Sequence, residues 1–367
     1  RGIAEPRAER ATRRWWIAGL VLVLVAVASA WAALGGAPDR AAAGAPAPGG
    51  TRDRRRDSEG TPVSSYSATV HPPMRSPNRR HDLSLLHKYT SAATAQIVLR
   101  TSCLRWSSPL LFNDPFDVPR QLELPFTSTD LRAAVARRFE AYLAGIARPG
   151  SPAALVILEA LEKENPLRHS RMLKDLRESL HIMAAPMELA FEQLRTAWLQ
   201  KVKHLRIACF SAIGDSPTMW AHYADNHKGV VLQFESSDER DSSFLLAKPV
   251  LYQSERPVLP LVDRWARAFL GEEEIDWDEY FHEYYYVKSE EWSYEREYRA
   301  ISAELDDTKL YYYSPFFRED LRGVILGTSL MDADEAAIRE LARAYPNAII
   351  YRAQHDHEAR RVSCVPA

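Results

Sequence analysis

The sequence has only three cysteines in 367 residues, and they are far apart. Cys103, Cys209 and Cys364 form no CxxC pair and no spacing that is typical of a zinc site. Because their number is odd and their spacing is not that of a paired framework, a small disulfide-stapled fold is excluded. Unpaired thiols are typical of a reducing compartment, so they favour a cytoplasmic location for the main part of the chain.

Several motifs that would identify a class of enzyme are also missing. The chain has no GxGxxG or P-loop for nucleotide phosphates, no Gly-x-Ser-x-Gly elbow and no HExxH. His222 and His227 are five residues apart on a predicted helix, which aligns two metal ligands poorly, so we predict no metal site. The net charge of -2 gives no overall electrostatic footprint for nucleic acid or for an anionic membrane.

One long apolar run is present near the start of the sequence. No charged residue occurs from Trp15 to Gly36, and Leu, Val and Ala dominate, so the run could span a bilayer as a helix. It fits a single-pass anchor, a cleaved export signal with small residues such as Ala28 and Ala30, or upstream sequence that is not part of the protein. Residues 37–80 are rich in Ala, Pro, Gly, Ser and Arg without apolar periodicity, which predicts a disordered linker.

Residues 83–365 have the patterning of a folded α+β domain. Short apolar segments predict strands, and a period of 3.6 residues from about 129 to 205 predicts three or four helices inserted into a mixed or antiparallel β core. Ser216 and Pro217 predict the start of another helix, and Gly229 predicts its end. The predicted strands are 83–90, 104–106, 207–211, 230–234, 297–302, 310–313, 323–326 and 348–351, and the remaining predicted helices are 92–100, 277–287 and 333–345.

The segment from Trp292 to Arg299 contains two glutamates that are two residues apart. On a strand, alternation would place Glu295 and Glu297 on one face, with Arg299 beside them. On a helix, Glu291, Glu295 and Arg299 would instead form a row of surface ion pairs. Two carboxylates in a cleft can stabilise a developing cation and orient a nucleophile. The strand alternative therefore makes Glu295 and Glu297 candidate catalytic residues.

Three groups of segments together resemble a bacterial family known as domain of unknown function 2971. The groups are Leu86–Thr90 with Phe112–Asp117, Cys209–Ser211 with Met219–Gly229, and Lys288–Arg299. The resemblance runs from about Leu83 to Val362 and includes Gly323–Gly327. Since the family is uncharacterised, the resemblance implies a domain and little about its function.

A second resemblance is to the ADP-ribosyltransferases. These enzymes carry an Arg or His, then a Ser or Tyr, then a Glu, often in Glu-x-Glu, on separate strands. Here Lys88 lies where related sequences show the His of His-Tyr-Thr, Ser211 ends the second strand, and Glu295-x-Glu297 supplies the third part. The resemblance implies an ADP-ribosyltransferase-like fold and NAD as a substrate, with no other cofactor firmly implied.

The same resemblance implies a role for each matched residue. Lys88, with Tyr89, would hold the dinucleotide, and Ser211 would support the nicotinamide pocket. Glu297 would bind the nicotinamide ribose, and Glu295 would orient the acceptor. Lys88 departs from the pattern, because lysine has neither the directed hydrogen bonds of histidine nor the fork of arginine, and this favours a phosphate-rich ligand.

The helix that starts at Ser216 has two interpretations. In the first, Trp220, His222 and Tyr223 line a nucleotide pocket in which aromatic rings stack on nicotinamide or adenine. In the second, Met219, His222, Tyr223 and Asn226 form one helix face that packs on the sheet and binds no ligand. The sequence leaves both open.

Three classes of function fit these residues. The first is an NAD-consuming ADP-ribosyltransferase-like enzyme, such as a toxin or an anti-phage effector. The second is a non-catalytic module that senses a nucleotide or binds a partner. The third is a metal-dependent nuclease or phosphodiesterase built on Lys88, Asp114, His222 and Glu297. A small nucleotide is the expected ligand, the protein or nucleic-acid acceptor is left open, and a membrane would be reached through the N-terminal run.

Overall fold

The computed structural model describes residues 75–150 and 184–367, apart from residues 258, 276, 305–307, 359 and 360, together with positions 152, 155, 158, 159 and 174. These residues form two compact units. The helical unit contains residues 118–202 and 256–285, and the sheet unit contains the described residues up to 117, residues 203–255 and residues 286–367. The apolar run 15–36 and the predicted linker as far as residue 74 lie outside the described residues.

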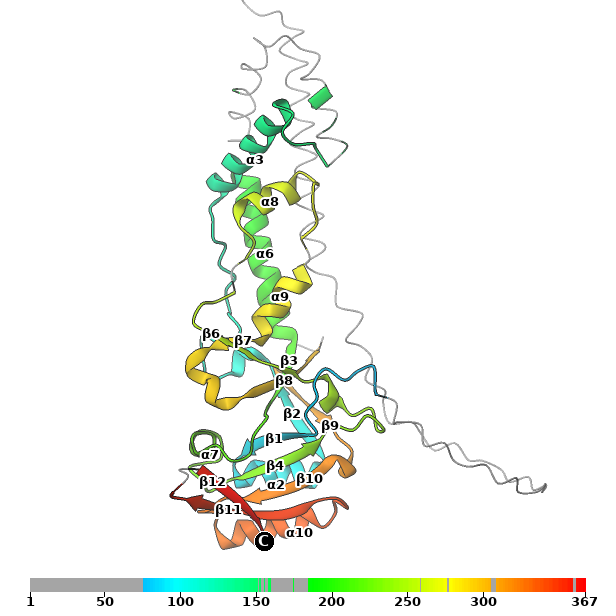
Figure 1. The fold of residues 1–367 in the computed structure, drawn as a ribbon, viewed down its shortest axis with the longest axis vertical. Helices are drawn as coiled ribbons and strands as arrows, with labels where there is room; N and C mark the ends of the chain where they lie inside the picture. The colour runs from blue at the N-terminus through cyan, green and yellow to red at the C-terminus, as the bar shows by residue number, and fades with distance from the viewer. Residues whose placement is uncertain are drawn as a thin grey trace, which may run out of the picture. The chain divides into compact units, whose positions relative to one another are not determined.

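The sheet unit is built around a mixed sheet, in which β10 and β11 are parallel and the other strand pairs are antiparallel (Figure 1). The strand order is β12-β11-β10-β4-β1-β3-β2-β9, and β8 pairs with β3 and β5. The predicted α+β class is therefore confirmed. The strands are β1 (Leu85–Thr90), β2 (Cys103–Ser107), β3 (Leu205–Ser211), β4 (Val230–Glu235), β5 (Lys248–Pro249), β8 (Glu297–Ala303), β9 (Tyr311–Pro315), β10 (Leu321–Leu326), β11 (Ile349–Asp356) and β12 (Arg361–Pro366).

Helices cover both faces of this sheet. Side chains along each strand alternate between the two faces of the sheet. Leu86, Leu232 and Phe234 lie on one face, where they form the main core with α2 (Ala92–Thr101) and α10 (Asp332–Ala342). Tyr89, Val231 and Ile325 lie on the other face, where α7 (Pro217–Tyr223) packs on them. Because both faces are buried, the central strands read as short continuous apolar runs. This is why they could be recognised in the sequence.

Strand β3 pairs extensively with only one of its three neighbouring strands. This strand pairs with β8 over seven residues, but with β1 only at His87–Ser211 and with β2 only at Ser107–Ile207. Beyond the first of these pairs, the Lys88 ammonium donates a hydrogen bond to the Cys209 carbonyl at 2.7 Å. The register therefore places the end of β3 at the junction of β1 and β8.

Helix α7 begins as predicted, with the Ser216 side chain accepting a hydrogen bond from the Met219 backbone. It ends at Tyr223, however, so the predicted end at Gly229 is wrong. Residues 225–227 follow with φ between +47° and +65°, a left-handed conformation that Asp, Asn and His tolerate better than most residues. Gly229 is required for another reason: a Cβ there would lie 2.2 Å from the Thr90 carbonyl oxygen.

The helical unit contains α3 (Ser128–Leu143), most of α6 (Ala184–His204), α8 (Val262–Phe269) and most of α9 (Trp277–Tyr286). Leu131, Val135 and Phe139 of α3 pack with Trp265 and Phe269 of α8, as the 3.6-residue period predicts for the first three. No helix in the described part of the chain is long and apolar enough to cross a membrane. The domain limits drawn from the sequence stay a prediction.

The remaining elements are short. They are the parallel pair β6 (Leu251–Gln253) and β7 (Val287–Ser289), and the 3-10 turns η1 (Pro109–Leu111), η2 (Ser243–Leu246), η3 (Glu290–Glu295) and η4 (Arg318–Asp320). The sequence patterns predicted none of the strands β5, β6, β7 and β12. Strands of two or three residues give no measurable alternation, and β12 is only half buried along its length.

Candidate functional site

Glu295 and Glu297 lie in two different elements, so neither the strand alternative nor the helix alternative describes both of them. Glu295 ends η3, Arg296 is left-handed with φ of +44°, and Glu297 begins β8. The prediction that both glutamates lie on one strand is therefore wrong for Glu295. A helical row through Glu291, Glu295 and Arg299 is excluded too, because Arg299 is a strand residue. The tight turn at Arg296 nevertheless brings both carboxylates to the same lysine.

That lysine is Lys288 of β7. Its ammonium lies 2.6 Å from Glu295 Oε2, 3.3 Å from Glu297 Oε2 and 3.7 Å from Asp117 Oδ2. It also lies 4.7 Å from the centroid of the Trp292 ring, close enough for a cation–π contact. Lys288 thus contacts three carboxylates: Glu295 at the end of η3, Glu297 at the start of β8, and the distant Asp117.

Arg299 completes the group by using both sides of its guanidinium. Nη1 and Nη2 donate to the Asp117 carboxylate at 2.9 and 2.6 Å, while Nε and Nη2 donate to the Glu297 carboxylate at 2.8 and 2.9 Å. Planar bidentate pairing of this kind fixes geometry as well as charge. We call Asp117, Lys288, Glu295, Glu297 and Arg299 the ionic cluster.

The ionic cluster is almost completely buried. Arg299 is 0% exposed and Glu297 4%, and the other three members are also classed as buried. With every group ionised, three carboxylates face two cations, so the cluster carries one excess negative charge. Buried charges are tolerated only when they are paired, so the excess must be relieved by a proton or by a cationic ligand.

The carboxyl best suited to take that proton is Glu295. Burial raises the pKa of Glu295; Lys288 opposes this shift, and the charge of Glu297 adds to it. Burial would also raise the pKa of Glu297, but Arg299 and Lys288 outweigh it and hold that pKa well below its usual range. Neighbouring carboxyls with separated pKa values can act as a proton carrier and a permanent anion.

Aromatic side chains surround Glu295. The Tyr223 hydroxyl donates to Glu295 Oε1 at 2.5 Å, and burial raises the pKa of Tyr223. His222 is exposed, and its Nδ1 lies 3.1 Å from the hydroxyl of Tyr294. Tyr223 therefore contacts the ionic cluster directly, His222 contacts Tyr294, and a nucleotide pocket at these residues stays a prediction.

Trp220 and Tyr89 belong instead to the core between α7 and the sheet. Trp220 is fully buried, and its Nε1 donates to the Gly214 carbonyl at 3.0 Å. The Tyr89 hydroxyl donates to the Ile213 carbonyl at 3.1 Å, and the two rings meet edge to face. Met219, which the packing interpretation names, is buried in the same cluster.

Strand register distinguishes His87 from Lys88. His87 is paired with Ser211, and Ser211 is paired with Glu297, so these three side chains share one face across β1, β3 and β8. Lys88 alternates to the opposite face, where its ammonium is 5.8 Å from the Phe210 ring. The Ser211 hydroxyl donates to the Glu295 carbonyl at 2.6 Å and so holds the turn between the two glutamates.

The sequence patterns missed Asp117, Lys288, Tyr252 and Cys209. The Tyr252 hydroxyl accepts a hydrogen bond of 2.7 Å from the Glu297 backbone. The Cys209 thiol contacts the Glu297 carboxylate, and burial raises the pKa of that thiol. Asp117 was quoted only as the end of a turn and Lys288 only as the start of a motif. No local pattern could have placed either one beside Glu297.

Histidine burial predicts how stability depends on pH. Burial lowers the pKa of His81 and of His87, each below the ordinary value of 6.5. The unfolded chain therefore binds these protons first as pH falls through about 6.5, and the free energy of unfolding should decrease below that pH. Urea unfolding at pH 7.5, 6.5 and 5.5 measures this effect.

The variant His87→Gln isolates one contribution to that pH dependence. Glu295 acts in the opposite direction, because its raised pKa makes the folded state the better proton binder. The difference between wild type and His87→Gln cancels the Glu295 contribution. A variant that loses stability on acidification as steeply as wild type would contradict the role given to His87.

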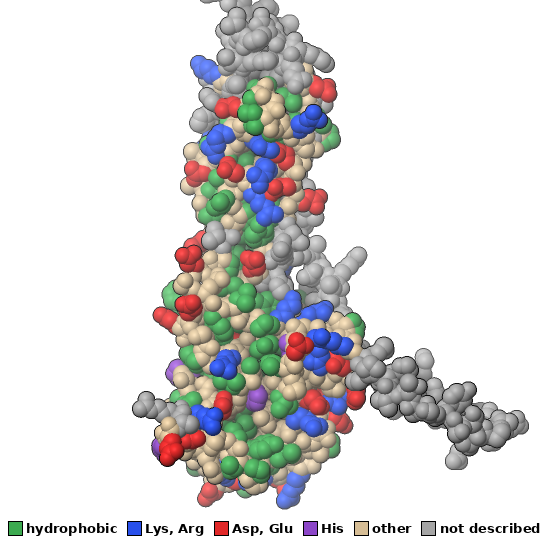
Figure 2. Space-filling view, viewed as in Figure 1, with side chains coloured by type: hydrophobic (Ala, Val, Ile, Leu, Met, Phe, Trp, Pro, Cys, Tyr) green, Lys and Arg blue, Asp and Glu red, His purple; other side chains and the backbone are tan. Residues whose placement is uncertain are grey.

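The residues of the nuclease hypothesis are not gathered in this way. Asp114 Oδ1 accepts a hydrogen bond of 2.8 Å from the Phe116 backbone, as in an Asx turn. Within the described ranges, no group of three or more His, Cys, Asp or Glu side chains is arranged to hold a metal ion. On the face in Figure 2, positive and negative side chains are interspersed rather than gathered by sign.

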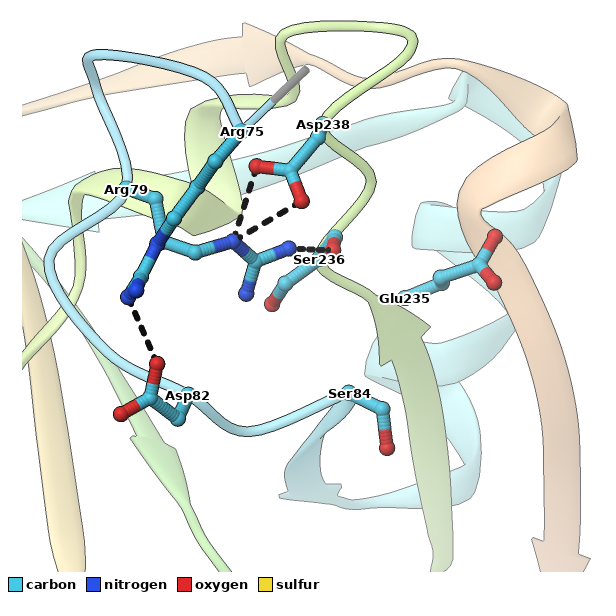
Figure 3. Close-up of a pocket in the computed structure, with 7 residues that line it drawn as sticks. All are labelled: Arg75, Arg79, Asp82, Ser84, Glu235, Ser236 and Asp238. Atoms are coloured by element: carbon cyan, nitrogen blue, oxygen red, sulfur yellow. Dashed lines mark hydrogen bonds and ion pairs between the residues drawn. The ribbon is translucent and has the colours of Figure 1, made fainter. Parts of the chain in front are cut away.

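A separate open hollow of about 390 Å³ lies between the segment before β1 and the loop after β4 (Figure 3). Arg79 Nε donates to both oxygens of Asp238, at 2.8 and 3.1 Å, and Arg75 pairs with Asp82 at 2.6 Å. Both arginines are thus occupied by neighbouring carboxylates. The hollow is lined by Arg75, Arg79, Asp82, Ser84, Glu235, Ser236 and Asp238.

Comparison with known families gives one match. Residues 219–300 match the model of a family described as "Protein of unknown function (DUF2971)". The matched stretch contains Tyr223, Lys288 and the segment Glu295–Arg299, whereas His87 and Asp117 precede it. The predicted resemblance to this family is confirmed over that stretch. No curated protein and no solved structure matches the chain.

Proposed function

We propose that the sheet unit cleaves the nicotinamide–ribose bond of NAD and passes the ADP-ribose to water or to an acceptor, with Glu297 at the centre of the site. The observation that carries this proposal is the row His87, Ser211 and Glu297 on three neighbouring strands. The ADP-ribosyltransferase resemblance calls for a His or Arg, a Ser or Tyr and a Glu on separate strands. The register fills the first position with His87, one residue before the predicted Lys88.

Charge supports the same chemistry. When the bond between ribose and nicotinamide breaks, nicotinamide leaves with the bonding electron pair and positive charge develops on the ribose. A permanently ionised Glu297 would stabilise that charge, as carboxylates do in glycoside hydrolysis. The excess negative charge of the ionic cluster also suits the cationic pyridinium ring of oxidised NAD. Half-buried Tyr223, Trp292 and Tyr294 offer aromatic surface for that ring.

Glu295 has the properties of the group that receives the acceptor proton. The attacking hydroxyl or water loses a proton as its oxygen bonds to the ribose carbon, and a base must take that proton. Glu295 accepts a hydrogen bond from Tyr223, and burial raises its pKa, which makes its carboxylate a stronger base than an exposed one. Glu297 and Glu295 thus keep the two roles that the resemblance implies for them.

Two neighbouring substitutions test this proposal. His87→Ala should lower kcat/KM for NAD cleavage by about 10- to 100-fold, the effect of losing a hydrogen bond to a charged or polar substrate group. Lys88→Ala, on the opposite face of β1, should change it by less than about threefold. Release of nicotinamide from NAD by the purified full chain provides the measurement. Equal losses in the two variants, or no cleavage by wild type, would reject the proposal.

A second function is favoured by one specific observation. Glu297 already has two bonds to Arg299 and a contact with Lys288, so its carboxylate is occupied by cations of the chain itself. A nucleotide-sensing module without turnover fits such an occupied carboxylate. Binding of NAD without nicotinamide release, measured by calorimetry beside the cleavage assay, would select this alternative.

A further inference from the structure

All members of the ionic cluster belong to the sheet unit, and two of them are close in sequence to points where the chain leaves or re-enters it. Asp117 is the last residue before the helical unit begins at Val118, and Lys288 follows shortly after the chain returns to the sheet unit at Tyr286. Tyr252, which hydrogen bonds to the Glu297 backbone, lies just before the chain leaves again at Arg256. Lys288 and Tyr252, which contact Glu297, and Asp117, which pairs with Arg299, are therefore all close in sequence to the segments that connect the two units.

The members of the cluster differ in how firmly the backbone fixes them. Glu297 and Arg299 belong to β8, which pairs with β3 over seven residues. Asp117 follows a turn, and Lys288 is the middle residue of the three-residue strand β7. Displacement of the connecting segments would therefore move Asp117 and Lys288 while leaving Glu297 and Arg299 in place.

The backbone at one of these connections is strained. Val118 has a φ of +22°, which a β-branched residue rarely adopts, and its side chain is 1% exposed. Strain of this kind persists only where surrounding contacts impose it, and it is concentrated at functional and switching segments. Val118 directly follows Asp117, whose carboxylate is held by two hydrogen bonds from Arg299.

We propose that Asp117 and Lys288 hold the Glu297 site closed, and that movement of the segments joining the two units opens it. In the closed state the two residues satisfy Arg299 and Glu297 and exclude solvent from both. On opening, Arg299 keeps Glu297 ionised while the Lys288 side of the carboxylate becomes accessible to a cationic ligand. The catalytic consequence rests on the proposed function, whereas the opening itself does not.

Carboxyl footprinting of the full chain tests the opening. A water-soluble carbodiimide and glycine ethyl ester label accessible carboxyls, and peptide mass spectrometry reports the rate for each residue. Asp320 is a matched control, because it is 1% exposed and paired with Arg240 within the same unit, but is distant in sequence from the connections. If the site opens locally, Glu297 should be labelled at least about tenfold faster than Asp320, which waits for a larger unfolding event. Equal rates for the two residues would overturn the inference.

The variant Asp117→Asn provides a second comparison. It keeps the shape of the side chain but removes the charge that pairs with Arg299, so labelling of Glu297 should rise by a further factor of about ten relative to wild type, while Asp320 stays constant. Glu340→Gln, which alters an exposed pair with Arg343, should leave both rates unchanged. Faster labelling of Asp320 in Asp117→Asn would show that this variant unfolds globally. The ratio of the Glu297 and Asp320 labelling rates in wild type would then be the test of the opening.

Nicotinamide release measured on the same samples separates this inference from the proposed function. Fast labelling of Glu297 in wild type without any NAD cleavage supports the opening and rejects the transferase. NAD cleavage with equal labelling of Glu297 and Asp320 supports the transferase and rejects the opening.

Discussion

Replacing Arg299 with Met is expected to lower the free energy of unfolding by about 3–5 kcal/mol, because it leaves buried carboxylates without their cation. Asp117 would lose both of its hydrogen bonds to the guanidinium, and Glu297 would keep Lys288 as its remaining cationic partner in the ionic cluster. Met preserves much of the side-chain volume, so the loss reports charge rather than a cavity. Urea unfolding of the full chain at pH 7.5 gives the difference.

Two controls make this expectation specific. Arg343→Met removes an exposed ion pair with Glu340 and should leave the unfolding midpoint unchanged. Combining Arg299→Met with Asp117→Asn should cost less than the sum of the two single losses, because the second change removes a charge that the first left unpaired. Additive losses would mean that Asp117 and Arg299 do not depend on each other.

Glu297→Gln is expected to lower kcat for NAD cleavage by about 10²–10³-fold, the usual effect of removing one group that stabilises developing charge. The amide keeps the shape of the side chain but cannot neutralise the cationic ribose. Glu295→Gln should instead flatten the pH dependence of transfer, because the residue that takes up the proton is lost. Nicotinamide release between pH 5 and 9 measures both effects.

Each glutamate variant also weakens a buried ion pair, so activity must be compared at equal folded fraction. Unfolding curves for both variants supply that fraction, and Glu297→Gln should be the less stable variant, because it removes the charge that pairs with Arg299 as well as a contact with Lys288. A folded Glu297→Gln protein with wild-type turnover would exclude this residue as the centre of the site.

Features that depend on neighbours in the chain could be predicted from the sequence. Strands β1, β3, β4 and β10 were found because their apolar residues are buried on both faces of the sheet. The start of α7 was found because Ser216 and Pro217 act through adjacent backbone groups. Its end was not found, because three consecutive left-handed residues break the helix before the glycine is reached.

The candidate site was only partly predictable. The choice between His87 and Lys88 depends on register, since a shift of one residue moves a side chain to the other face of the sheet. Glu295 and Glu297 were singled out on the assumption of one strand, whereas a left-handed Arg296 brings them together. Asp117 is 182 residues from Arg299 along the chain, and only the fold brings them together.

Cys209, whose thiol contacts Glu297, is expected to react slowly with oxidants. Burial raises the pKa of Cys209, so almost no thiolate forms near neutral pH, and the thiolate is the form that oxidants and alkylating agents attack. Burial also raises the pKa of Cys364, but this cysteine is exposed, so such reagents reach it more readily. Oxidative stress would therefore mark the surface of this protein while leaving the environment of Glu297 chemically intact.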